Sequence, residues 1–253
     1  MLATPQELKF KGCSDKYIKN ELSGIRYIHN QTSDTKYTLT DPKVFNEKVL
    51  ELGSTKDGRV DRSWTDREFK EMIKKCQELG RADMEKTIVC IRDTGMRLDE
   101  GCTLKRNQVE EALKTGKLHL ENTKGGRPRD INLTENARET LERVIVDVPR
   151  GGYVLTPQQY VDNHKIQNFE KAVEDFVRYH RSKIQDSDRK GNAHNVLNHE
   201  RAALTPHGLR HTYARDELYR LKERMPEREA RQLLAEELGH GRESVTGIYV
   251  PKD

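Results

Sequence analysis

The apolar residues of this chain recur at steps of three and four along most of its length, which is the period of helices with one buried face. Only residues 117–133 change to alternation. There Leu118 and Leu120 lie on one arm, Ile131 and Leu133 lie on the other, and a Gly-Gly pair separates the arms. This pattern predicts a β-hairpin with a basic turn. The sequence therefore predicts a mainly α fold with one small antiparallel β-sheet, an α+β protein.

Capping and terminating residues mark several helix ends. Thr65 and Glu68 have the spacing of a capping box, and Gly80 is expected to end the helix that they begin. A second, mostly buried helix is broken at Gly95, and Thr134 is the expected N-cap of a helix after the hairpin. The apolar stripe of the first of these helices is Phe69, Met72, Ile73, Cys76 and Leu79.

A polar, glycine-containing stretch divides the chain. Residues 54–62 are expected to form a linker between a small helical region, residues 1–53, and a larger domain, residues 63–253. Residues 182–201 are polar throughout and predict a mobile loop. In the small region, one expected helix begins at Asp41, and an earlier helix has an apolar face composed of Ile18, Leu22, Ile25 and His29.

Composition limits the function less than the pattern does. The chain has 46 basic and 42 acidic residues, so its charge of +4 fits a nucleic-acid binder no better than many other proteins. Its four cysteines have no CxxC or zinc-finger spacing, which predicts free thiols in a reducing compartment. The sequence shows no signal peptide and no apolar run of about 20 residues. We therefore expect a soluble, intracellular protein without a membrane partner.

Four short stretches carry cationic or nucleophilic side chains: "TGMRLDE", "NTKGGRPRD", "TPHGLRHTYA" and "LGHGRESVTGIYV". Each has an ordinary explanation when taken alone, such as a helix-capping arginine or a solvated lysine. Together they supply two arginines, a lysine and two histidines, a set that suits the oxygens of a phosphodiester, with a tyrosine that could attack its phosphorus. These candidate catalytic residues are Arg97, Lys124, His207, Arg210, His240 and Tyr249.

A metal site is the first alternative. His207 and His211 are four positions apart on a predicted helix, as in an HExxH motif, but the glutamate of that motif and a third ligand are missing. The four stretches also lack the clustered Asp or Glu ligands of a metal-dependent nuclease. We therefore expect no metal and no other cofactor.

The four stretches, in this order and at these spacings, resemble the tyrosine recombinase (phage integrase) family over about residues 62–253. The resemblance implies a site-specific recombinase that cuts and rejoins DNA without metal or nucleotide. Tyr249 would attack the scissile phosphate and leave a 3′-phosphotyrosyl link and a free 5′-hydroxyl. Two alternatives share the fold or the chemistry: a type IB topoisomerase that relaxes DNA, and a DNA-binding regulator that no longer cuts.

The resemblance also implies a role for each remaining candidate. Arg97 and Arg210 would clamp the non-bridging oxygens. Lys124 would protonate the leaving 5′-oxygen, His207 would accept the proton of the tyrosine, and His240 would hydrogen-bond the phosphate.

Supporting residues are implied in the same way. Glu100 would support the arginine site, and His211 would orient its neighbours. Arg127 and Arg129, in and after the hairpin turn, would contact DNA phosphates. Binding to DNA should then weaken steeply with salt, with a log–log slope of about −0.9 for each phosphate neutralised.

The N-terminal region resembles part of the family's helical core-binding domain, with Lys16, Lys19 and Arg26 facing DNA. It is about half the usual length, and the chain stops four residues after Tyr249, so we expect a compact or trimmed member. The resemblance further implies double-stranded DNA as partner and a homo-oligomer on DNA, as a tetramer in synapsis. It also implies an accessory directionality protein, and a cytoplasmic, nucleoid-associated location in a bacterium or phage, encoded by a mobile element.

Overall fold

The computed structural model describes residues 4–13, 15–32, 41–42, 45, 50–52, 60–121, 128–162, 165–191 and 200–239. The chain forms two compact units, Met1–Asp57 and Gly58–Asp253, and the predicted linker, residues 54–62, spans the division between them. The described part is mostly helical with a small antiparallel sheet, as predicted. Within the described ranges, no helix combines the length and the apolar character needed to cross a membrane.

The N-terminal unit contains helices α1 (Pro5–Phe10) and α2 (Asp15–Gln31). Ile18 and Leu22 of α2 are buried, as predicted. Ile25 is 48% exposed, however, so the buried face of α2 is narrower than the apolar spacing predicted. The helix expected to begin at Asp41 lies largely outside the described residues. The small core of this unit is completed by Leu50 and Leu52.

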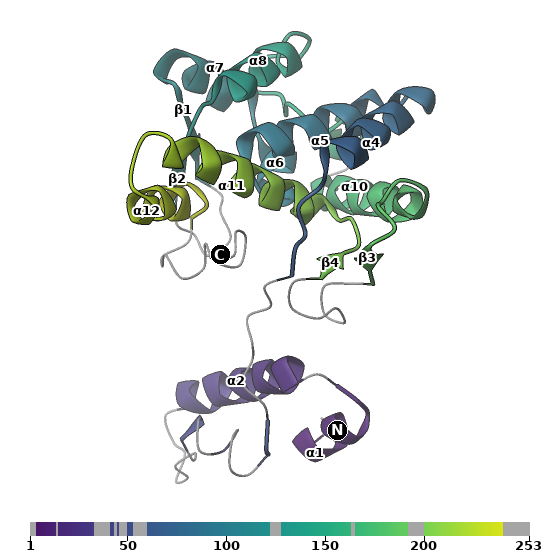
Figure 1. Cartoon of the computed structure of the whole chain (residues 1–253), viewed down its shortest axis with the longest axis vertical. Coiled ribbons are helices and arrows are strands. Elements are labelled where there is room, and N and C mark those ends of the chain that lie inside the picture. The colour runs from purple at the N-terminus through teal and green to yellow at the C-terminus, as the bar shows by residue number, and fades with distance from the viewer. Residues whose placement is uncertain are drawn as a thin grey trace. The chain divides into compact units, whose positions relative to one another are not determined.

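Helix α5 (Ala82–Thr94) is central to the larger unit. It packs against α4 (Asp66–Glu78), α6 (Leu98–Thr103), α8 (Glu135–Val144) and α11 (Pro206–Lys222) (Figure 1). Residues of α5 enter both buried apolar clusters of this unit, and so do residues of α11. These two helices therefore form the frame on which the other elements are placed. The remaining elements are α7 (Arg106–Thr115), β1 (Lys117–Leu120), β2 (Arg129–Asn132), α9 (Gln158–Asp162), α10 (Ile166–His180), η2 (Arg181–Lys183), β3 (Arg189–Lys190), β4 (Arg201–Ala202) and α12 (Glu227–Glu237).

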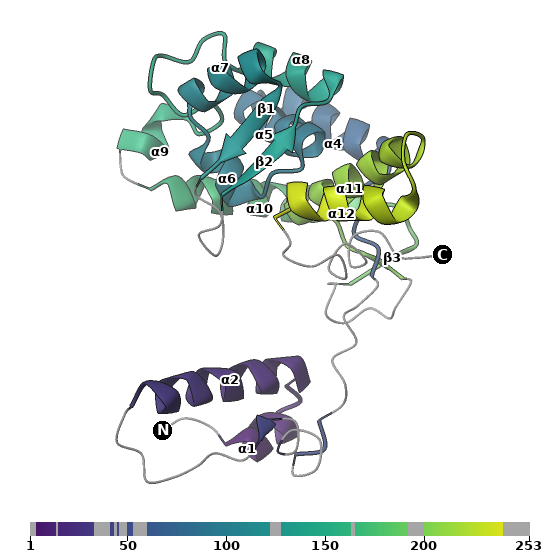
Figure 2. The same ribbon diagram turned by 90° about the vertical axis from the view of Figure 1, so that its left-hand side faces the viewer.

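The predicted hairpin is confirmed. Strands β1 and β2 pair antiparallel, and Leu118 lies opposite Ile131. Their side chains alternate between buried and exposed, because successive residues of a strand point to opposite faces. Figure 2 shows the two strands side by side; β1 packs on α7, and β2 packs on α12. The basic turn, residues 122–127, lies outside the described residues.

The predicted capping residues of the larger unit are also confirmed. Thr65 and Glu68 form a capping box at the start of α4, and Thr134 caps α8. Gly95 ends α5 in the left-handed conformation, with φ of +66°. Leu79 does not belong to the buried stripe of α4, since it follows the last helical residue and is 52% exposed.

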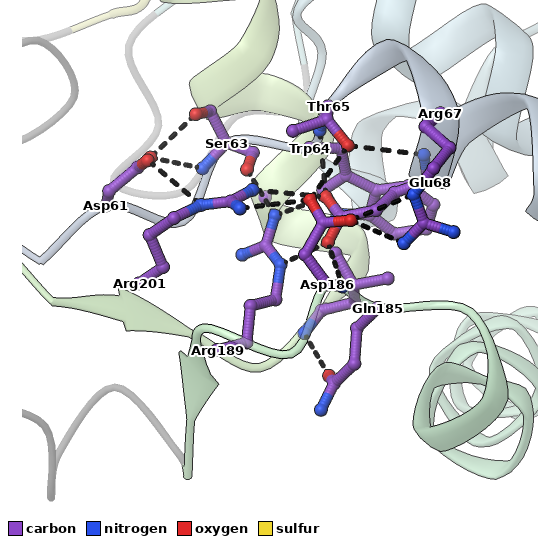
Figure 3. A network of polar contacts seen from close by, with 12 residues as sticks. Asp61, Ser63, Trp64, Thr65, Arg67, Glu68, Gln185, Asp186, Arg189 and Arg201 are labelled. Atoms are coloured by element: carbon purple, nitrogen blue, oxygen red, sulfur yellow. Dashed lines mark hydrogen bonds and ion pairs between the residues drawn. The ribbon is translucent and has the colours of Figure 1, made fainter.

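The polar stretch 182–201 was predicted to be a mobile loop, and this prediction is wrong for its described part. Strands β3 and β4 pair in parallel, and Asp61 forms a bridge with Arg201 on the other side of β4. Arg189 of β3 is buried and donates to the Glu68 carboxylate of α4 through Nε, at 2.6 Å (Figure 3). The prediction failed because Arg189 is held by Glu68, which lies 121 positions away and which a local pattern cannot reveal.

Glu68 is the centre of this polar network (Figure 3). Its carboxylate accepts hydrogen bonds from the backbone N–H groups of Thr65 and Asp186, each at 2.8 Å, and from the guanidinium groups of Arg189 and Arg201. Burial acts to raise the pKa of the Glu68 carboxyl, but these hydrogen bonds and the nearby positive charge bring it below its usual value. A fully buried carboxylate is thus held ionised where α4 meets β3 and β4.

We expect Glu68→Gln to lower the free energy of unfolding by about 3–5 kcal/mol, because it leaves the buried Arg189 charge without its partner. Urea unfolding followed through the fluorescence of Trp64, the single tryptophan, measures this loss. The stabilisation should be present above the unfolded pKa of about 4.3 and should be lost as the pH falls below it, because folding lowers this pKa. The control is Glu78→Gln, which breaks an exposed pair with Lys75 and should cost less than about 1 kcal/mol. Equal losses in the two variants would contradict the buried ion pair.

Candidate active site

Arg210 is fully buried in the first turns of α11. Its Nη1 donates to the carbonyl oxygen of Gly95 at 2.6 Å, and its Nη2 donates to the carbonyl oxygen of Leu238. The first carbonyl lies at the turn between α5 and α6, and the second lies at the end of α12. Arg210 therefore joins three helices, and it draws together the turn that precedes Arg97 and the residues that precede His240.

Gly95 is required at its position for two reasons. Its positive φ is one that side chains rarely adopt, and a Cβ there would lie 2.2 Å from the ring of Tyr213. Tyr213 is on α11, three residues after Arg210, so the α5–α6 turn is pressed against the helix that carries Arg210. The close approach places the Gly95 carbonyl within reach of the guanidinium.

Arg97 is the N-cap residue of α6. Its backbone N–H donates to Glu100 Oε2 at 2.7 Å, and its Nη1 donates to Glu100 Oε1 at 2.8 Å. The Arg97 side chain is 20% exposed, whereas the Glu100 side chain is 1% exposed. The carboxylate thus fixes both the backbone and the guanidinium of a partly accessible arginine. This geometry agrees with the supporting role predicted for Glu100, which stays a prediction.

Arg129, which the sequence predicted to contact DNA phosphates, is instead engaged inside the protein through all three nitrogens of its guanidinium. The side chain is 4% exposed and forms an ion pair with Glu100, with Nη2 at 2.6 Å from Oε2. Its Nε donates to the carbonyl oxygen of Glu237, at the end of α12, at 2.8 Å. The two-residue period of the strand did indicate that Arg129 is buried. Arg129 alternates with exposed Asp130 and shares the inward face of β2 with Ile131.

The pKa of the Glu100 carboxyl shows how strongly the site is polarised. Burial acts to raise this pKa, but the hydrogen bonds and charge of Arg129, the Arg97 N–H and the charge of Arg210 lower it to about 2. Glu100 is therefore an anion at neutral pH. It offsets part of the positive charge that three arginines bring into a small buried space.

The N-terminus of α11 is fixed by the residues that enter the larger unit. Trp64 donates from Nε1 to the carbonyl oxygen of Thr205 at 3.0 Å, and its backbone N–H donates to Thr212 Oγ1 at 2.8 Å. A Cβ at Gly208 would lie 2.3 Å from the carbonyl oxygen of Arg62, so the chain at residues 62–64 packs directly on α11. This packing sets the position of the turn that bears His207 and Arg210.

The two histidines of this turn differ in environment. His207 is exposed, whereas His211 is 1% exposed, and their rings are 5.2 Å apart between centroids in an edge-on arrangement. An exposed imidazole at the start of α11 can reach a bound substrate. A buried imidazole against it can set its orientation, as predicted for His211.

Several predicted site residues lie outside the described residues, namely Lys124, Arg127, His240 and Tyr249. In the N-terminal unit, Lys16 is exposed, and Lys19 is half-buried. Arg26 is also half-buried, with its guanidinium carbon 5.7 Å from the centre of the Phe45 ring. The structure thus bonds Arg97 and Arg129 to Glu100, and it holds Arg129 and Arg210 on the consecutive carbonyls of Glu237 and Leu238. Sequence reasoning had assigned Arg129 elsewhere.

Comparison with known proteins agrees with this fold. The model of the family described as "Phage integrase family" matches residues 62–253, about three quarters of the chain. A search of the curated proteins found no match. One similar solved structure is the Tn1549 transposon integrase in complex with transposon right-end DNA, with TM-score 0.62 and 17% identity, covering 98% of this chain and 79% of that one. Another is the lambda integrase dimer bound to a COC′ core site, with TM-score 0.56 and 16% identity, covering 97% and 61%.

The mainly helical frame with its small hairpin is the fold of a tyrosine site-specific recombinase. The chain belongs to the phage integrase family.

Proposed function

We propose that this recombinase cleaves DNA with Tyr249 as the nucleophile and with Arg97 and Arg210 as the clamp on the scissile phosphate. The observation that carries the proposal is the bonded cluster of Arg210, Gly95 and Leu238. It fixes a buried guanidinium between the Arg97 turn and the residues that lead to His240. A guanidinium fixed before the reaction stabilises developing negative charge without reorganisation.

The phenol oxygen of Tyr249 forms a bond to phosphorus, and the bond from phosphorus to the 5′-oxygen breaks. His207 accepts the proton of the phenol, and Lys124 gives a proton to the leaving 5′-oxygen. His240 hydrogen-bonds the phosphate. Attack by a new 5′-hydroxyl reverses these steps and rejoins the strand, so the energy of the phosphodiester is kept in the phosphotyrosyl bond.

The partners belong to the same proposal. Double-stranded DNA is the substrate, since the similar Tn1549 and lambda structures hold DNA. Lys16, Lys19 and Arg26 of the N-terminal unit contact its phosphates, and Arg127 does the same from the hairpin turn. Four copies of the chain assemble at synapsis, and an accessory protein sets the direction of recombination. The protein acts in the cytoplasm, at the nucleoid, and its task is the integration or excision of a mobile element.

The test uses duplex fragments from the DNA that flanks the coding sequence. Fragments retained by the protein are first identified by binding, and each is then made with a nick beside the candidate scissile phosphate. The nick lets the short 5′-hydroxyl fragment diffuse away, so the covalent intermediate accumulates. We expect an SDS-resistant protein–DNA adduct whose yield is unchanged by EDTA. Tight binding without an adduct on any fragment would contradict strand cleavage and favour a regulator that binds without cutting.

A further inference from the structure

Two buried arginines bind consecutive carbonyl groups at the end of α12. Arg129 donates from Nε to the carbonyl of Glu237 at 2.8 Å, and Arg210 donates from Nη2 to the carbonyl of Leu238. The carbonyl end of a helix carries partial negative charge, so cations bind there favourably. The next residue is Gly239, which directly precedes His240 in the sequence. The end of α12, at Glu237 and Leu238, is therefore held by two guanidinium groups.

Gly239 packs against Arg129 as well. It has φ of +64°, and a Cβ at this position would lie 2.8 Å from Arg129 Cδ. The aliphatic part of the Arg129 side chain thus lies against Gly239, and its guanidinium binds the carbonyl of Glu237. Any movement of Arg129 would change where the chain leaves α12 toward His240.

The other side of the same guanidinium binds Glu100. Nη1 and Nη2 of Arg129 each donate to one carboxylate oxygen, and that carboxylate also accepts from the backbone N–H and Nη1 of Arg97. Lysine could not replace this arrangement, since one ammonium group cannot make the bidentate contact and reach the helix carbonyl at once. Arg129 therefore links the partner of Arg97 to the end of α12.

We propose that Arg129 is a positioning residue of the cleavage reaction, which couples Arg97, through Glu100, to the end of α12, from which the chain continues to His240. The proposal rests on the proposed function, because it concerns how that site is held in place. It replaces the contact to DNA phosphates that the sequence predicted for Arg129. The residue acts through its neighbours and does not touch the substrate.

The test measures the single-turnover rate of adduct formation on the nicked duplex at saturating protein. We expect Arg129→Lys and Arg129→Met to slow cleavage by about 10- to 100-fold, the loss that follows when the partner that orients a metal ligand is removed, because Arg129 orients its neighbours in the same indirect way. The dissociation constant for DNA and its salt slope should not change. Arg129→Met should also move the acid limb of the pH–rate profile to higher pH, because Glu100 loses the guanidinium that keeps it ionised.

A double-mutant cycle distinguishes coupling from general damage. In a Glu100→Gln background, Arg129→Met should slow cleavage far less than it does alone, since the linkage is already broken. The matched control is Arg138→Met. Arg138 also donates to a helix carbonyl, that of Leu113 at 2.7 Å, and this carbonyl belongs to α7. This control should leave the cleavage rate unchanged.

Three results would overturn the proposal. The first is an unchanged rate at saturation together with weaker binding and a salt slope reduced by about 0.9, which would restore the phosphate contact. The second is a fully additive double mutant. The third is an equal loss of rate in Arg138→Met.

Hydrogen exchange at the backbone amides of Leu238 and Gly239, which donate to Leu234 and Glu236, gives a readout that is independent of activity. If the wild-type protein forms no adduct, the proposed function fails, and this exchange still decides the structural part of the inference. Faster exchange in Arg129→Met supports the hold on α12, and unchanged exchange overturns it.

Discussion

Replacing Tyr249 by phenylalanine will reduce the covalent adduct by about 10⁴-fold or more, because removal of a nucleophile leaves only binding and electrostatic stabilisation. The substitution deletes one oxygen atom, so the affinity for duplex DNA should remain. The measurement is the yield of SDS-resistant adduct on the nicked duplex over time, beside a binding curve for the same duplex. Retained binding with no adduct would show that the phenol oxygen performs the reaction.

Tyr219→Phe is the matched control for this prediction. Tyr219 belongs to α11, the helix that carries His207 and Arg210, and is 63% exposed. Loss of its hydroxyl should leave the adduct yield at the wild-type level. An adduct that persists in Tyr249→Phe would mean that another residue is the nucleophile, and the assignment of Tyr249 would be wrong.

Arg210→Lys should slow cleavage by about 10²- to 10³-fold at saturating protein, the effect typical of removing one fixed donor to developing negative charge. Lysine keeps the positive charge, so long-range attraction of DNA is retained. It cannot donate to the carbonyls of Gly95 and Leu238 and at the same time approach the phosphate. The single-turnover rate of adduct formation measures the loss.

Arg220→Lys tests whether the Arg210 effect is local. Arg220 lies on the same helix, and its guanidinium is paired with Glu217. We expect a cleavage rate close to that of wild type, because Arg220 pairs with Glu217 and not with the carbonyls of Gly95 and Leu238, even though lysine cannot reproduce its bidentate contact. Urea unfolding of both variants separates a loss of catalysis from a loss of folded protein. A rate for Arg210→Lys that matches Arg220→Lys would contradict the clamp.

The features that sequence analysis predicted correctly depend on neighbours along the chain. The capping box at Thr65 and Glu68, the left-handed Gly95 and the paired arms at Leu118 and Ile131 follow from spacings of a few residues or from one short turn. Such spacings fix backbone geometry directly, because they determine which hydrogen bonds can form locally. They were enough to predict a mainly helical fold with one hairpin.

The features that it missed depend on partners far away in the sequence. Arg189 is ordered by Glu68, 121 positions before it, and Arg129 binds Glu100, 29 positions before it. A charged residue in a polar stretch is usually solvated, so only the tertiary structure shows that these two are buried. For Arg129, the strand period was the one local signal, since it placed the side chain on the face of Ile131.

The most direct test of the account is the chemical identity of the protein–DNA link. The adduct from the nicked duplex is digested with protease, and the peptide that remains on the DNA is identified by mass spectrometry. The 5′ end of the released strand is labelled with a polynucleotide kinase without prior phosphatase. We predict a peptide that contains Tyr249 joined to a 3′-phosphate, and a 5′ end that accepts label at once. A 5′-phosphate on the released strand, or a link through any other residue, would contradict the account.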